Sequence, residues 1–471
     1  MTISLRPYVL EGGGGRRTDA EVGSLSVPMN RLEPGRGTVE LQFVRLPATT
    51  PGAGPPIIFL NGGPGLSAIR AARGRLFALF DALRAAGDVI LLDQRGAGSS
   101  TPTLQCLESS GTSFVGMEKL LTRDEAVRLA IDSVRRCVQQ LSRAGVDVHA
   151  FHTNESADDV AHLAHALNAP HVSVVAWSYG THLAFAVMRR QPQLVARAVL
   201  AGPEGPDHTF KLPSRIEQYL AAIDARARAE LPGAPGLLVT MRRVLDAVEA
   251  RPPIVAMPHT SAAPTTARVS RFDLEWMTAE GVADVRMIAR LPGWYARMAR
   301  GHFDDIARDP VLRTYYESLR TDLALTMARV CMDCASGVSR ERWQRIEREA
   351  PTTLLGRTVD FPLPDVCEAV GMPDLGDAFR APVRSDTPAL FVTGTLDART
   401  PAENAHELMP GFANASHLTV EDAGHTDLLH APAVRAAAVR FLRGAAVASM
   451  RVPAEHPLRF EPIEPHGSTA A

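Results

Sequence analysis

The chain has 471 residues, which is more than one ordinary domain uses, so two structural units are expected. Its 50 basic and 52 acidic side chains leave a formal net charge of −2, and no electrostatic field favours nucleic acid or an anionic membrane as a partner. No segment approaches the ~20 apolar residues of a membrane helix. Residues 1–17 lack the apolar stretch of a signal peptide, so as written the chain is expected in the cytoplasm. A misassigned start would hide a signal and place the protein in the periplasm or outside the cell.

The chain begins with little pattern and then alternates strands with helices. Residues 1–26 are expected to be poorly structured, and the alternating, β-rich residues 39–46 predict an antiparallel edge strand. Apolar runs at 55–60 and 89–92 predict two strands, with a helix over 67–85 between them. Such alternation is typical of parallel βαβ units.

The alternation continues through helices at 123–144 and 155–167 and strands at 172–177 and 195–201. It then stops, and residues 207–385 are mostly helical in pattern, with proline-rich breaks. Strands at 388–394 and 417–420 and a helix at 431–442 resume it, so the helical segment is an insertion. The expected organisation is a poorly structured N-terminus (1–26), the first part of an α/β core (27–206), a helical cap (207–385), the second part of the core (386–445) and a loose C-terminal tail (446–471).

The helix predicted over 155–167 carries Asp158, His162 and His165 at helical spacing. Thr153 or Asn154 is expected to cap it. A metal site is one interpretation of the three side chains, but a solvated polar face explains them better. We therefore predict no metal site here.

The predicted strand that ends at Trp177 runs directly into Ser178, Tyr179 and a helical pattern. This strand–turn–helix context is the one that a nucleophile elbow requires. The turn is sharp, and the small residues Ala176 and Gly180 flank the serine two positions away on each side. Glycine is usual at both places, and alanine tolerates a positive φ less well. Taken alone, the segment fits a helix cap equally well.

A serine nucleophile needs a histidine base and a carboxylate that orients the base, and α/β-hydrolases supply them in the order Ser, Asp/Glu, His. Asp397 and His425 follow Ser178 in that order, each just past a predicted strand. Asp397 could instead cap the next helix, and His425 could be an ordinary loop residue. Asp422 and His430 lie close enough in sequence to be mistaken for the acid and the base.

An oxyanion hole needs two backbone N–H groups. One is expected from Tyr179, the residue after the nucleophile. The other is expected from the loop 61–65, at Gly63, where glycine lets the backbone approach a substrate closely. No Gly-Lys-Ser/Thr follows this loop, so it is a poor phosphate cradle, and no cofactor is predicted.

Five cysteines are present, Cys106, Cys137, Cys331, Cys334 and Cys367. An odd number in a long chain argues for reduced thiols. The pair at 331 and 334 is a lone CxxC with no second pair or histidines at the spacing of a zinc site, so no metal is expected there either.

Three motifs together resemble the prolyl aminopeptidase (proline iminopeptidase) family of serine peptidases. They are Asn61-Gly62-Gly63-Pro64-Gly65, Asp93-Gln94-Arg95-Gly96-Ala97-Gly98-Ser99 and Trp177-Ser178-Tyr179-Gly180-Thr181. Val27-Pro28-Met29-Asn30 and Val330-Cys331-Met332-Asp333 are similar to the tripeptidyl-aminopeptidase-like branch. The resemblance spans roughly 27–443 and departs from the family at Asn61, where many members have histidine, and at Ala176.

The resemblance implies an α/β-hydrolase fold, a mostly parallel sheet flanked by helices with an inserted helical cap. It also implies that Ser178, Asp397 and His425 are nucleophile, acid and base. Secreted members suggest that Cys106 pairs with Cys137, and Cys367 with Cys331 or Cys334, whereas the missing signal argues against disulfides.

The sequence thus favours a serine hydrolase, an aminopeptidase that releases residues or short peptides from free N-termini. The α-ammonium of such a substrate needs a carboxylate partner. Glu204, just past the strand that ends at Ala201, is the expected one, with a solvated turn residue as the alternative reading. An esterase or amidase acting on small molecules is the competing function, and a non-catalytic binding protein on a hydrolase fold is the other. The expected partner is a peptide or small molecule with a free N-terminus, and the oligomeric state stays open.

Overall fold

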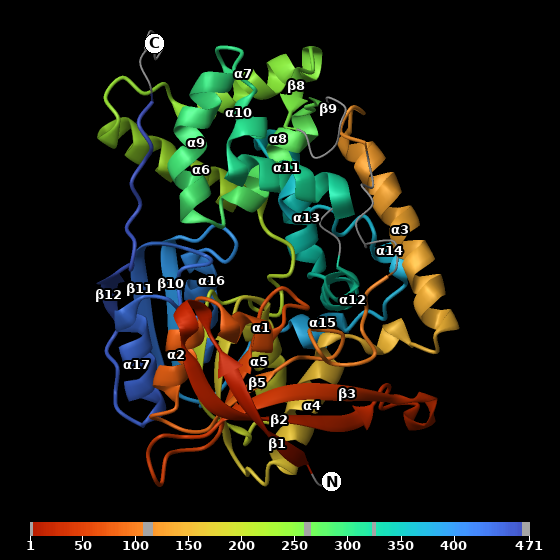
Figure 1. The fold of residues 1–471 in the computed structure, drawn as a ribbon, viewed down its shortest axis with the longest axis vertical. Coiled ribbons are helices and arrows are strands. Elements are labelled where there is room, and N and C mark those ends of the chain that lie inside the picture. The colour runs from red at the N-terminus through yellow and green to blue at the C-terminus, as the bar shows by residue number, and fades with distance from the viewer. Residues whose placement is uncertain (1–2, 107–115, 259–264, 323–325, 464–471) are drawn as a thin grey trace.

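A ten-stranded sheet forms the core of the computed structural model, which describes residues 3–106, 116–258, 265–322 and 326–463 (Figure 1). The strand order is β1-β2-β3-β5-β4-β6-β7-β10-β11-β12. β1, β2, β3 and β5 pair antiparallel, and all pairs from β5 to β12 are parallel. The strands are β1 (Ser4–Glu11), β2 (Arg17–Pro28), β3 (Thr38–Leu46), β4 (Ile57–Leu60), β5 (Val89–Leu92), β6 (Val172–Trp177), β7 (Val195–Ala201), β10 (Ala389–Leu396), β11 (Ala415–Gly424) and β12 (Met450–Pro453). The predicted mostly parallel sheet is confirmed.

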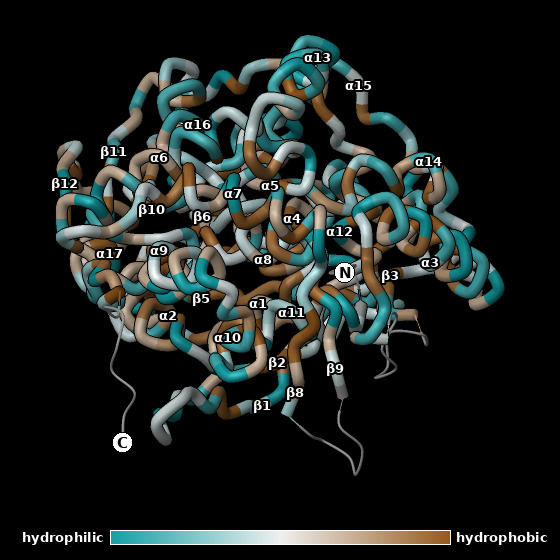
Figure 2. The backbone as a smooth tube through the Cα atoms, turned by 90° about the horizontal axis from the view of Figure 1, so that it is seen from above, coloured by the Kyte–Doolittle hydropathy of each residue, from teal (hydrophilic) through white to brown (hydrophobic). Residues whose placement is uncertain are grey.

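Helices cover both faces of the sheet, which is why its central strands are apolar throughout. In β4, Ile58 and Leu60 face one hydrophobic core, and Ile57 and Phe59 face the other. The first core lies under α3 (Arg123–Arg143), α4 (Thr153–Ala166), α5 (Tyr179–Arg190) and α16 (Ala402–Leu408), and the second under α1 (Ala68–Arg73), α2 (Phe77–Leu83) and α17 (Pro432–Leu442). Figure 2 shows hydrophobic residues in the central strands and hydrophilic ones on outer helices such as α13 (Arg340–Glu349).

The N-terminal segment is not poorly structured, as the sequence suggested. β1 and β2 form an antiparallel hairpin over residues 4–28, with Ser4 opposite Ser24 and Glu11 opposite Arg17. β1 is mostly exposed, so it lacks the apolar alternation that predicts a strand, and its proline is tolerated because the strand lies at the sheet edge. The hairpin also makes β3 an inner strand between β2 and β5, and the prediction of an edge strand at 39–46 was wrong.

Two helix predictions need correction. The helix expected over 67–85 is divided into α1 and α2, and Gly74 forms the C-cap of α1. The N-cap of α4 is His152, whose Nδ1 accepts from the Glu155 N–H at 3.3 Å, not Thr153 or Asn154. Histidine is not among the side chains that usually cap a helix, which is why the pattern misplaced the start.

The C-terminal segment that begins at residue 446, expected to be loose, contains a strand and buried residues. β12 adds a parallel strand beside β11, and Leu458 and Phe460 are buried after it. The Glu461 N–H donates to the Ala289 carbonyl at 3.0 Å. Isolated apolar residues among prolines give no periodic signal, so the sequence could not show that this segment packs along the cap.

The inserted segment is mostly helical and lies over the sheet, at the top of Figure 1. Its helices are α6 (Pro213–Glu230), α7 (Leu237–Ala250), α8 (Arg271–Gly281), α9 (Val285–Met298), α10 (Asp305–Arg308), α11 (Pro310–Asp322), α12 (Met327–Ser336), α13, α14 (Cys367–Val370) and α15 (Gly376–Arg380). One hairpin, β8 (Ile254–Met257) with β9 (Thr265–Arg268), interrupts them. Among the described residues, no helix has both the length and the apolar composition needed to cross a bilayer.

Two disulfides brace the molecule. Cys106, after β5, is bonded to Cys137 of α3, and Cys334 of α12 is bonded to Cys367 of α14. Cys331 is a buried free thiol. The expectation of reduced thiols was therefore wrong for four of the five cysteines, and the pairing implied by the family resemblance is present, with Cys334 as the partner of Cys367.

Candidate active site

Ser178 occupies a strained turn between β6 and α5. Its backbone has φ 56° and ψ −128°, one of three positive φ values among the described non-glycine residues. Such conformations cost about 1–3 kcal/mol and concentrate at functional sites. Gly180 is required, because a Cβ there would clash with the Leu60 carbonyl oxygen. Ala176 lies within β6 and has no positive φ, so alanine is compatible with the turn.

The structure brings the three expected side chains together. Ser178 Oγ lies 2.9 Å from His425 Nε2, and His425 Nδ1 lies 2.9 Å from Asp397 Oδ2. Asp397 is 2% exposed. A carboxylate can only accept, so His425 Nδ1 carries the proton and Nε2 can accept from the serine hydroxyl. The arrangement can therefore take a proton from Ser178.

Asp397 does not cap the next helix, because the N-cap of α16 is Pro401, with no side-chain cap bond; its two oxygens bond instead to the turn before that helix and to His425. Oδ1 accepts from the N–H groups of Arg399 (2.9 Å) and Thr400 (2.8 Å), as a turn cap does. Oδ2 accepts from the Thr400 hydroxyl at 2.7 Å in addition to His425. Trp177 holds the histidine from the other side, since its Nε1 donates to the His425 carbonyl at 3.2 Å.

The two neighbouring residues that could be mistaken for the acid and the base are engaged elsewhere. Asp422 forms an ion pair with Arg226 of α6. The backbone N–H of His430 donates to the Asp427 carbonyl at 3.0 Å, and burial lowers the pKa of its imidazole to about 4. Neither side chain hydrogen-bonds to Ser178 or His425 in the part of the chain that the structure describes.

The loop 61–65 lies against Ser178. A Cβ on Gly62 would come within 2.9 Å of the Ser178 Cβ, and the Gly62 N–H already donates to Asn61 Oδ1 at 3.0 Å. Gly63, with φ 113°, is the next amide and lines the same cavity as Ser178. Tyr179 begins α5, where helix geometry leaves an N–H without an intrahelical partner.

The motif 93–99 supports this loop rather than the chemistry. Buried Asp93 accepts from the Ser67 hydroxyl and the Ser99 N–H, both at 2.8 Å, and burial raises the pKa of its carboxyl. Gln94 Nε2 donates to the Asn61 carbonyl at 3.0 Å. The conformation of the loop beside Ser178 therefore depends on these side chains.

Ser178 and His425 line a cavity of about 180 Å³ that lies between the core and the cap. Its wall is rich in charge, with Glu204, Lys211, Glu280, Arg329, Asp333 and Arg399. Sequence reasoning found only Glu204 among these six. The sequence contained a signal for Asp333, because this residue belongs to the segment 330–333 that carried part of the family resemblance.

Most of these charges have partners, and one does not. Arg399 pairs with Glu280 at 3.2 Å, and Arg329 with Asp333 at 3.4 Å. Glu204 is 7% exposed, and among the described residues its carboxylate has no hydrogen-bond or ion-pair partner. Burial, with the Glu204 charge nearby, raises the pKa of Asp333 to about 7. An unpaired buried carboxylate is costly, so this wall suits a cationic group.

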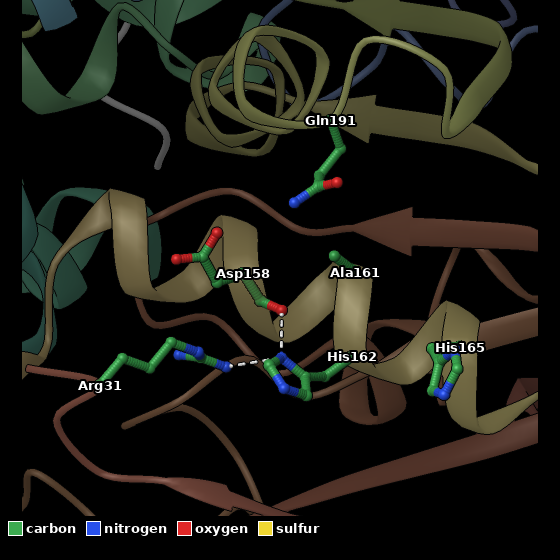
Figure 3. Close-up of a pocket in the computed structure, with 6 residues that line it drawn as sticks. All are labelled: Arg31, Asp158, Ala161, His162, His165 and Gln191. Carbon is green, nitrogen blue, oxygen red and sulfur yellow. Dashed lines mark hydrogen bonds between the residues drawn. The ribbon is translucent and has the colours of Figure 1, made fainter. Parts of the chain in front are cut away.

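The polar residues of α4 form a separate surface, shown in Figure 3. Asp158 binds Arg190 through both oxygens, at 2.6 and 2.8 Å. His162 lies 3.1 Å from an Arg31 nitrogen, and His165 lies apart from both. Within the described ranges, no group of three or more His, Cys, Asp or Glu side chains is placed to hold a metal ion.

A protein-family model described as alpha/beta hydrolase fold matches residues 55–432. The chain is 28% identical over 209 residues to the serine protease Hip1 of Mycobacterium tuberculosis, covering 43% of this chain and 39% of that protein. It is 29% identical over 192 residues to the protein named "Putative hydrolase YuaR" of Escherichia coli, covering 38% and 35%. It is 38% identical over 89 residues to carboxylesterase B of M. tuberculosis, covering 18% and 17%. The chain thus spans well under half the length of these curated relatives.

Among solved structures, proline iminopeptidase of Mycobacterium smegmatis has a TM-score of 0.40 at 17% identity, covering 89% of this chain and 97% of that one.

Proposed function

The chain belongs to the alpha/beta hydrolase fold family, and we propose that it is a serine hydrolase that acts as an aminopeptidase. Ser178 Oγ attacks the scissile carbonyl carbon, and His425 Nε2 takes the hydroxyl proton. The oxyanion accepts from the N–H groups of Tyr179 and Gly63. His425 then protonates the leaving amine, and water, activated by the same histidine, hydrolyses the acyl-enzyme. Asp397 keeps the imidazole in the required tautomer.

The observation that carries the peptidase assignment is the unpartnered Glu204 carboxylate in the cavity of the nucleophile. A substrate α-ammonium supplies the missing counter-charge. Asp333 faces the same cavity from the cap, and its proximity to Glu204 adds a second acid to the ammonium site. An exopeptidase needs such a site to select a free N-terminus over an internal peptide bond.

The relatives support two competing activities. Hip1 is a serine protease, which favours the peptidase, and carboxylesterase B favours an esterase. The test uses purified protein with three substrates: peptide amides with free N-termini, the same peptides acetylated, and small neutral esters. Faster turnover of the free amines is expected. Equal turnover of acetylated peptides, or turnover of esters alone, would make the protein an amidase or esterase, and no turnover at all would make it a binding protein.

Glu204→Gln is expected to weaken turnover of free-amine substrates selectively. The amide keeps the shape of the side chain but loses its charge. The activation free energy that kcat/KM reports for these substrates should therefore rise by about 1.5–3 kcal/mol, the value of a hydrogen bond to a charged group. Neutral esters should be hydrolysed nearly as before. Glu403→Gln, an exposed glutamate of α16, is the control and should change neither substrate. An equal loss on amines and esters would make Glu204 structural.

The pH dependence of KM should report Asp333. Below its raised pKa, the Asp333 carboxyl is neutral and cannot pair with a cation. Burial raises this pKa, as do the charges of Glu204 and Asp360, whereas Arg329 and Lys211 lower it. The substrate α-ammonium loses its own proton near pH ~8. KM for a free-amine substrate should therefore be lowest between about pH 7 and 8, with no such minimum for an ester. A flat KM profile for the amine across this range would remove Asp333 from the site.

The disulfides also bear on location. Disulfides persist in oxidising compartments and are rare in the cytosol. The pairs Cys106–Cys137 and Cys334–Cys367 therefore favour the periplasm or the extracellular space over the cytoplasm.

A further inference from the structure

A chain of buried hydrogen bonds connects the cap to the helix that follows the nucleophile. Tyr179 Oη lies 3.1 Å from Thr153 Oγ1, which lies 3.2 Å from Ser336 Oγ. Ser336 Oγ lies 3.1 Å from His182 Nε2, and His182 Nδ1 lies 3.0 Å from the Gly205 carbonyl. The four side chains are at most 1% exposed, so water cannot replace a lost partner.

The chemistry of these groups sets the direction of every bond. A carbonyl only accepts, so His182 Nδ1 carries the proton and Nε2 is the acceptor. Ser336 must then donate to His182, Thr153 to Ser336, and Tyr179 to Thr153. Burial lowers the pKa of His182, which agrees with the neutral ring that this order requires. Each hydroxyl and ring N–H of the chain then has an acceptor within it.

This chain reaches the backbone beside both acids of the proposed ammonium site. Ser336 ends α12, one turn after Asp333, so its hydroxyl fixes the helix that carries the cap acid. Gly205 follows Glu204 directly, so His182 fixes the turn that carries the core acid. A second bond ties the same turn to α5, because Thr181 Oγ1 accepts from the Glu204 N–H at 2.7 Å.

We propose that Ser336 and His182 are positioning residues for substrate selection: they hold Glu204 of the core and Asp333 of the cap at the spacing that receives an α-ammonium. The inference rests on the proposed function, because it assumes that these acids bind the substrate amine. Ser178, His425 and Asp397 make none of the four bonds, and Tyr179 takes part through its phenol and not through the N–H assigned to the oxyanion. A broken chain should therefore affect recognition of the amine more than the chemical step.

The experiment compares Ser336→Ala with the wild-type protein on a free-amine peptide amide and on a small neutral ester. Losing one buried hydrogen bond should raise KM for the amine substrate about tenfold, with kcat for the ester changed by less than about threefold. Ser336→Thr keeps the hydroxyl and should restore most of the amine KM. Ser318→Ala is the control, since Ser318 also lies in the cap but, among the described residues, its hydroxyl bonds only to the Tyr315 carbonyl of its own helix.

A double variant distinguishes a failure of this inference from a failure of the proposed function. Adding Ser336→Ala to Glu204→Gln should cause little further loss, because the positioned charge is already absent. Selective loss in Glu204→Gln but none in Ser336→Ala would overturn the positioning role and leave the function standing. No selective loss in Glu204→Gln would overturn the proposed function and this inference with it.

Melting curves show whether Ser336→Ala is folded. If it is not, His182→Gln takes its place, because glutamine offers both a donor and an acceptor. The same selective rise in the amine KM is expected from it. A fall in kcat on both substrates, with KM unchanged, would make the chain a purely structural feature.

Discussion

Ser178→Ala is expected to abolish turnover, with kcat lower by about 10⁴–10⁶. The substitution removes the hydroxyl that lies 2.9 Å from His425 Nε2 at the cavity, and the turn offers no substitute, because Trp177 and Tyr179 flank it. Steady-state kinetics on the best substrate measures the loss. Labelling by a fluorophosphonate probe, which requires an activated serine, should disappear with it.

Ser173→Ala is the matched control for this prediction. Ser173 lies on β6, the same strand, and is 2% exposed, but it faces neither His425 nor the cavity. Its substitution should leave kcat and labelling within about threefold of wild type. Wild-type labelling of Ser178→Ala would show that another serine is the nucleophile.

The core of the site could be predicted because its signals are local. Ser178, Asp397 and His425 each follow the end of a strand of one parallel sheet, and such ends gather at one edge. Their order along the chain and the small residue Gly180 could be read without knowing any long-range contact. Asp422, a few residues from His425, could not be excluded by sequence, because its ion pair with Arg226 joins residues 196 apart.

Except for Glu204, the charged wall opposite Ser178 and His425 could not be predicted, because it is made by the packing of cap on core. Glu204 is an acid in a turn between a proline and a glycine, and the sequence cannot tell whether it faces solvent or a cavity. Ser336 and His182 are 154 residues apart, and neither belongs to a recognisable motif. The hairpin of β1 and β2 was missed for a related reason: an exposed edge strand is defined by its partner and not by its own pattern.

Asp397→Asn is expected to lower kcat by about 10⁴, the effect of presenting the histidine in the wrong tautomer. The site leaves an asparagine only one good orientation. Its oxygen must take the place of Oδ1, which accepts from the N–H groups of Arg399 and Thr400, so its amide nitrogen faces His425. The amide then donates to Nδ1, the proton moves to Nε2, and the imidazole can no longer accept from Ser178.

Asp422→Asn tests whether this loss is specific to the orienting acid. Asp422 lies three residues from His425, on a backbone with φ 61° that asparagine tolerates, and its partially exposed ion pair with Arg226 joins β11 to α6. Losing a partly exposed ion pair costs little, so kcat should stay within about threefold of wild type, with at most a small change in melting temperature. Kinetics and melting curves of the two variants, measured side by side, show which substitution lowers kcat more and whether either changes stability. The expected ranking follows from the geometry, because Asp397 is the one carboxylate in contact with His425 among the described residues. A large kcat loss in Asp422→Asn with near-normal turnover in Asp397→Asn would contradict it and reassign the acid.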